Sequence, residues 1–208
     1  MNRLRFPFAT LALGLSVLAL AACGSSSSSS SSTGGSSSGG GGGAGAGALS
    51  AEAKSAATGD IPDNQVFLTF HDKAAAYSIS YPEGWAQTGS AGDVSFRDKN
   101  NIVHIAVGSG AQPTAASVKA DLAKERARAP SLQAGTPQPV ALNAGKAFKV
   151  TYTTESAPNA VTGKRVKLTV DRYVLAKGGK RAIVDLGTPV GVDNVDAYRM
   201  MAQSFRWQ

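Results

Sequence analysis

Downstream of residue 60, apolar and polar residues alternate with a period of two in a series of short segments, a pattern typical of β-strands with one buried face. Turn-forming residues separate these segments, as at Pro82-Glu83-Gly84 and Gly178-Gly179. Strands are therefore expected over residues 65–70, 77–81, 94–97, 102–107, 148–153, 166–175 and 181–186. Because short turns join consecutive strands, the prediction is an antiparallel sheet of about six strands. Trp85 follows the turn at Pro82-Glu83-Gly84 and is expected to pack under this sheet.

Two segments carry a helical pattern instead. The first runs over residues 114–129, with Thr114 as its N-cap and Pro130 as its stop. The second is capped by Asp193 or Asn194. Its expected inward residues are Val195, Tyr198, Met201 and Ala202. The two helices would flank the sheet, which makes the predicted domain α+β.

The first 22 residues combine a basic start with a short apolar stretch and small residues before Cys23. This is typical of a secretory signal peptide, and the stretch is too short for a membrane-spanning helix. The run Leu20-Ala21-Ala22-Cys23 resembles the lipobox of bacterial lipoproteins, whose cysteine becomes the first mature residue and carries lipid. We expect lipidation of Cys23, with palmitate or similar acyl chains giving a stable anchor. The alternative is an ordinary cleaved signal with an incidental cysteine.

Residues 23–60 are expected to form a flexible linker between this anchor and a domain over residues 61–208. Residues 24–48 are almost wholly Ser, Gly and Ala, a composition that buries too little apolar surface to fold. Such a linker would hold the domain away from a membrane. A low-complexity expansion with no selected length is the alternative.

The charge balance is basic, with 21 Lys and Arg against 14 Asp and Glu. Loss of Arg3 and Arg5 with the signal peptide leaves 19 basic side chains. This excess favours anionic surfaces such as lipid headgroups or wall polymers, although it is also typical of an ordinary soluble surface. No nucleic-acid partner is expected, because no nucleic-acid-binding motif accompanies the export signal. Since Cys23 is the only cysteine, the domain must fold without a disulfide.

Residues 77–85, Tyr-Ser-Ile-Ser-Tyr-Pro-Glu-Gly-Trp, resemble the opening of PsbP-like domains. The later order of elements is also similar: a hairpin, a helix rich in Ala and charge, three long strands, a terminal helix and Ser-Phe. The resemblance covers roughly residues 65–207 and implies an α/β/α sandwich around an antiparallel sheet. Bacterial members, including the LpqN type, are often exported lipoproteins with accessory roles. Photosynthetic relatives assist assembly and ion retention at a photosystem, a role to which nothing else in this sequence points.

Few residues carry recognisable chemistry. His71 and His104 lack clustered metal ligands, and no hydrolase motif is present, so we predict no catalytic residue, no metal site and no cofactor. Weak cation candidates are Asp171 and Asp185, which the Gly178-Gly179 hairpin would bring close together with Arg172 adjacent. The alternative is a solvated sheet edge in a slightly different register.

Two basic clusters mark the ends of one predicted strand. Lys164, Arg165 and Lys167 lie before and at its start, and Lys177, Lys180 and Arg181 lie at its end. The first cluster is a candidate contact for an anionic envelope partner. The alternative is that both clusters serve solubility.

These observations favour a non-enzymatic lipoprotein on the extracytoplasmic face of a membrane. We expect it to act as a binding or accessory module through contacts with an envelope protein or polymer. The alternative is a lipoprotein that binds a small ligand or ion in a pocket between sheet and helix. A hydrolase is a more distant possibility, because no nucleophile and base can be paired from the sequence.

Overall fold

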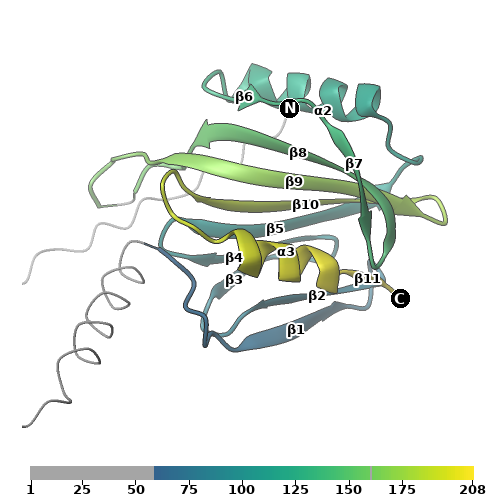
Figure 1. The fold of residues 1–208 in the computed structure, drawn as a ribbon, viewed down its shortest axis with the longest axis horizontal. Coiled ribbons are helices and arrows are strands. Elements are labelled where there is room, and N and C mark those ends of the chain that lie inside the picture. The colour runs from purple at the N-terminus through teal and green to yellow at the C-terminus, as the bar shows by residue number, and fades with distance from the viewer. Residues whose placement is uncertain (1–58, 160) are drawn as a thin grey trace, which may run out of the picture. The chain divides into compact units, whose positions relative to one another are not determined.

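The computed structural model describes residues 59–159 and 161–208, which form two antiparallel sheets and two helices. The larger sheet has eight strands in the order β3-β4-β5-β10-β9-β8-β6, with β7 also pairing with β8 (Figure 1). Its strands are β3 (Ala86–Ser90), β4 (Asp93–Asp98), β5 (Asn101–Ser109), β6 (Gln133–Ala134), β7 (Gln138–Leu142), β8 (Gly145–Glu155), β9 (Lys167–Lys177) and β10 (Lys180–Pro189).

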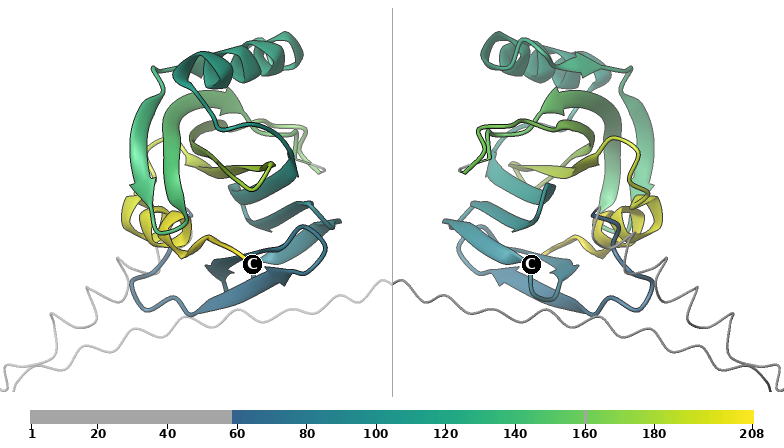
Figure 2. Two further views of the ribbon diagram at one scale, coloured as in Figure 1. Left: turned by 90° about the vertical axis from the view of Figure 1, so that its right-hand side faces the viewer. Right: turned by 90° about the vertical axis from the view of Figure 1, so that its left-hand side faces the viewer.

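A smaller sheet and the two helices pack on this large sheet. The smaller sheet has the order β1-β2-β11, formed by β1 (Phe67–Asp72), β2 (Tyr77–Pro82) and β11 (Arg206–Trp207). The large sheet curves, and the smaller sheet and α3 (Val195–Ser204) close its concave side (Figure 2). α2 (Ala115–Arg128) covers part of the outer face. Helices therefore lie on both faces of an antiparallel sheet, within the predicted α+β class.

Two apolar clusters fill the spaces between these layers. The main core lies on the concave side and joins Phe96 and Leu186 of the large sheet to Tyr77 of β2 and Met201 of α3, all fully buried. A smaller cluster lies between α2 and the sheet. The buried residues that α2 contributes to it are Val118 and Leu122. Because α2 contributes so few buried apolar groups, its polar contacts with the sheet also position it.

Most expected elements are present, and the local signals explain them. Thr114 caps α2, where its hydroxyl accepts a hydrogen bond from the Ser117 amide at 3.1 Å. Gly178 and Gly179 both have positive φ, as a two-residue hairpin turn requires, and Lys177 pairs with Lys180. Strands β3, β6, β7 and β11 were not expected. Every residue of β3 is exposed, so β3 has no alternation to detect.

Burial was predicted for Trp85 and for four residues of α3. Trp85 follows Gly84, whose φ is +86°, and is 9% exposed in the main core, as expected. Val195 was expected to face inward and does not, since it is 63% exposed at the first turn of α3. The other three predicted inward residues of α3 are buried. A residue in the first turn of a helix has fewer packing neighbours than one at its centre. The helical period gives the direction of a side chain but not its number of neighbours, so it did not predict the exposure of Val195.

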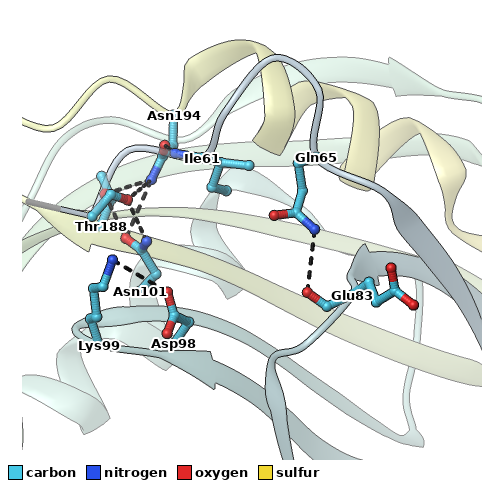
Figure 3. A network of polar contacts seen from close by, with 9 residues as sticks. Ile61, Gln65, Glu83, Asp98, Lys99, Asn101, Thr188 and Asn194 are labelled. Atoms are coloured by element: carbon cyan, nitrogen blue, oxygen red, sulfur yellow. Dashed lines mark hydrogen bonds and ion pairs between the residues drawn. The ribbon is translucent and has the colours of Figure 1, made fainter. Parts of the chain in front are cut away.

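The beginning of the described chain is tied to the body of the domain by a buried polar network (Figure 3). The Gly59 carbonyl accepts hydrogen bonds from Asn101 Nδ2 at 2.5 Å and Asn194 Nδ2 at 3.2 Å. Thr188 Oγ1 donates to Asn101 Oδ1, and the Ile61 amide donates to Asn194 Oδ1. Three polar side chains, Asn101 of β5, Thr188 of β10 and Asn194 before α3, thus hold the first described residues against the domain.

Candidate functional site

Arg172 and Asp185 form a buried ion pair on the face of the large sheet that α2 partly covers. The two residues lie opposite each other in the β9–β10 ladder. Arg172 Nε donates to Asp185 Oδ1 at 2.7 Å, and Nη2 donates to Oδ2 at 2.6 Å. Arg172 is 3% exposed and Asp185 is 6% exposed. This two-bond geometry is the strongest way for side chains to hold a buried guanidinium and carboxylate.

The pair extends into a line of charges that crosses the sheet and reaches α2. His104 lies opposite Asp185 in the β5–β10 ladder, with its Nδ1 3.9 Å from Asp185 Oδ2. His104 Nε2 lies 2.8 Å from Asp93 Oδ1 on β4. On the other side, Arg172 Nη1 lies 2.8 Å from Glu125 Oε1 of α2. We call Glu125, Arg172, Asp185, His104 and Asp93 the ionic row.

Neighbouring charges decide the protonation of these groups. Burial alone would raise the pKa of Asp185, but the hydrogen bonds from Arg172 and the nearby His104 ring lower it below its ordinary value. Burial works against the charge of Arg172, yet Asp185 raises its pKa. The carboxylates of Asp185 and Asp93 raise the pKa of His104 despite its partial burial. The folded state therefore favours the charged form of each of these three groups.

The ionic row is arranged to join secondary-structure elements. It connects β4, β5, β10, β9 and α2 through side chains that contact one another. Ser95 lies opposite His104 in the β4–β5 ladder, which places a hydroxyl-bearing residue beside a His and an Asp. Both ring nitrogens of His104 nevertheless face carboxylates, so the ring is held by acids on either side.

Asp171 does not join this row, because its side chain projects from the opposite face of β9. Its Oδ2 lies 2.7 Å from Lys149 Nζ, and its Oδ1 accepts a hydrogen bond from Thr151 at 2.5 Å. The ladder sets Asp171 against Leu186 and Asp185 against Arg172. The predicted juxtaposition of Asp171 and Asp185 is therefore wrong. A register difference of one residue turns a side chain to the other face of a sheet.

Neither carboxylate is therefore placed to share a cation with the other. Each has a basic partner from the protein, Lys149 for Asp171 and Arg172 for Asp185. Within residues 59–159 and 161–208, no group of three or more His, Cys, Asp or Glu side chains is arranged to hold a metal ion. His71 lies apart in β1, where its Nδ1 is 2.7 Å from Gln208 Nε2.

The predicted basic cluster lies at one end of the β8–β9 hairpin and is exposed. Lys164 and Arg165 belong to the loop before β9, and Lys167 is the first residue of that strand. Arg165 Nη1 donates to the Ser156 carbonyl at 2.9 Å, which holds the loop. At the other end of the strand, Lys180 bonds the Ala75 carbonyl and Arg181 pairs with Asp121 of α2 at 2.6 Å. That second cluster is therefore partly structural.

An apolar groove lies between the β7–β8 hairpin and the segment before α2. Its volume is about 600 Å³. Pro113 forms one wall, and Pro139, Ala141 and Phe148 line the hairpin side. Of the described residues that line it, Lys146 alone carries a charge. The β7–β8 hairpin and the segment before α2 thus enclose a hollow whose lining suits an apolar partner.

Sequence reasoning identified Asp185 and the adjacent Arg172, but it did not bring His104, Asp93 or Glu125 to them and it missed the groove. His104 meets Asp185 through the pairing of β5 with β10, and Asp93 meets His104 through the pairing of β4 with β5; no local pattern specifies either pairing. Pro139 was a usable signal, because proline within a strand indicates a sheet edge. Cys23 lies outside the described residues. Among the described ones, no helix is both long and apolar enough to cross a membrane.

No protein-family model and no curated protein matches this sequence. Among solved structures, the solution structure of cyanobacterial PsbP (CyanoP) from Synechocystis sp. PCC 6803 is similar with a TM-score of 0.54 and 18% identity. The match covers 72% of this chain and 98% of that one. The similarity confirms the predicted PsbP-like fold, and at this identity it concerns the fold alone.

Two further solved structures are less similar. A crystal structure from Bacteroides thetaiotaomicron VPI-5482 has a TM-score of 0.45 and 14% identity, covering 67% of this chain and 48% of that one. The Saccharomyces cerevisiae Ran-binding protein Mog1p has a TM-score of 0.46 and 8% identity, covering 69% of this chain and 96% of that one.

Proposed function

We propose that this protein is a binding module held by lipid on the extracytoplasmic face of a membrane, where it serves as an accessory to an envelope protein or polymer. The signal peptide and the lipobox-like run ending at Cys23 support this location. The apolar groove carries the binding part of the proposal, because a hollow of about 600 Å³ with largely apolar walls is of the kind that proteins use to hold a partner.

The ionic row supports binding over turnover. A general base must reach the proton that it removes, and His104 is held between Asp93 and Asp185. The protein can be screened against esterase, phosphatase, peptidase and glycosidase substrates. We expect no turnover above background. Turnover that is lost in His104→Gln would contradict a purely binding role.

Site-directed photo-crosslinking in the producing cells tests the binding role. A photoreactive residue at Ala141, which is exposed and lines the groove, should yield a discrete crosslinked species. The matched control is the same residue at Ala120, which is exposed on α2 outside the groove. Identical products from the two positions, or none at Ala141, would refute the groove as the binding surface.

A second candidate function, binding of a small ligand, is favoured by how the groove is built. Its two walls are held by hydrogen bonds from other elements, so the hollow is preformed. Gln112 Nε2 donates to the Ala176 carbonyl at 2.7 Å, and Gln203 Nε2 donates to the Ala141 carbonyl at 3.1 Å. The mass of the adduct at Ala141 separates the two candidates, since a protein partner adds many kilodaltons and a small ligand adds hundreds of daltons.

A further inference from the structure

The shape of the groove limits what it can take. Its volume of about 600 Å³ lies within the range of about 300–1,000 Å³ that is usual for small-molecule sites. Among the residues that line it, Pro113 is buried and Phe148 is half-buried, while Pro139 and Ala141 are exposed. An apolar group of this size can therefore lie against these side chains and displace water from them.

The charge of the groove is simple. Lys146 is exposed and lies opposite Ala141 in the β7–β8 ladder, and none of the described residues that line the hollow is acidic. Within the described part of the chain, no ion pair engages the Lys146 ammonium group, whereas Lys149, three positions further along β8, is paired with Asp171. A ligand that complements this lining carries one anionic group on an apolar body.

The edge of the hairpin argues against an extended peptide as the occupant. A peptide that adds to a sheet needs backbone donors and acceptors along the edge strand. In β7, Pro139 has no N–H to donate, and the Ala141 carbonyl already accepts a hydrogen bond from Gln203. A ligand in this groove must therefore rely on apolar contacts and on Lys146.

We infer that the groove binds a single-chain amphiphilic carboxylate, with its chain along Pro113, Pro139 and Phe148 and its carboxylate at Lys146. This inference rests on the second candidate function, binding of a small ligand, and gives that function a ligand class. The apolar contacts supply most of the affinity, because an exposed ion pair contributes little. Lys146 supplies the preference for an acid over an uncharged molecule of the same length.

Titration calorimetry with decanoate and 1-decanol tests this assignment. The protein used is the full chain carrying Cys23→Ala, which removes the lipid acceptor and alters none of the described residues. Decanoate should bind saturably and up to about fivefold more tightly than decanol, the range for an exposed ion pair. Shortening the acid by two methylenes should weaken binding by about 4- to 15-fold, depending on how fully the chain is buried.

Two variants and one control locate the site. Lys146→Gln should abolish the preference for the acid, whereas Lys119→Gln, at a lysine that is also exposed and lies on α2, should leave it unchanged. Ala141→Phe should fill the groove and remove binding of both ligands, with the melting temperature checked for each variant. Equal binding of decanoate and decanol, or an acid preference that survives Lys146→Gln, would overturn the inference.

The outcome is separable from that of the proposed function. If decanoate fails to bind while the crosslinker at Ala141 still captures an envelope protein, the ligand assignment is wrong and the binding module stands. If neither experiment gives a product at the groove, both are wrong.

Discussion

The Asp185→Asn substitution tests the ionic row most directly, because it removes one charge from a buried pair and changes little volume. In the native protein, two hydrogen bonds of 2.7 and 2.6 Å join Asp185 to Arg172, and both residues are less than a tenth exposed. The variant leaves the guanidinium in the interior with Glu125 as its remaining carboxylate partner. Glu125 is itself 37% exposed in its side chain and compensates only in part.

The expected cost follows from the burial of the pair. Removing one partner of a buried ion pair costs about 3–5 kcal/mol, because the other charge is left without compensation. Replacing both residues, as in Arg172→Met with Asp185→Leu, should cost less than either single change, since no buried charge remains. Asp171→Asn is the matched control, because its pair with Lys149 is more exposed and should contribute about 1 kcal/mol or less.

Urea unfolding at neutral pH, followed by tryptophan fluorescence and circular dichroism, measures these differences. A double-mutant cycle over Arg172 and Asp185 then gives their coupling energy. A cost for Asp185→Asn no larger than that for Asp171→Asn would refute the assignment of a buried and mutually dependent pair. A double variant as unstable as the sum of the two single variants would also refute it.

Three further outcomes are expected. Trp85→Ala should lower the free energy of unfolding by about 3–5 kcal/mol in urea titrations, and a loss below about 1 kcal/mol would contradict its core position. Because the folded state raises the pKa of His104, its stabilisation is complete below the ordinary value of 6.5 and disappears as pH rises through the raised value. His104→Gln should therefore cost about 1 kcal/mol near pH 5.5 and little near pH 9, and an equal cost at both would argue against this linkage. Cys23→Ala should move the protein to the aqueous phase in detergent phase separation, whereas continued partitioning into detergent would exclude the lipid anchor.

Much of the fold could be read from local sequence signals. The capping by Thr114, the hairpin at Gly178-Gly179 and the alternation in β2 and β9 each depend on residues close together in the chain. The burial of Trp85 was predicted for a similar reason, since the turn before it fixes where the aromatic side chain enters the core. Propensity, period and turn geometry act over a few residues, so a sequence reveals them directly.

The composition of the candidate sites depended on the tertiary structure. Asp171 and Asp185 are both polar residues near one hairpin, yet a single register position separates the face of Arg172 from the face of Lys149. His104 reaches Asp185 because β5 pairs with β10 across a long stretch of sequence, and the groove forms where Pro113 meets the β7–β8 hairpin. Which strands become neighbours is decided by burial of the whole core, and a strand's local pattern does not encode the residues that lie beside it.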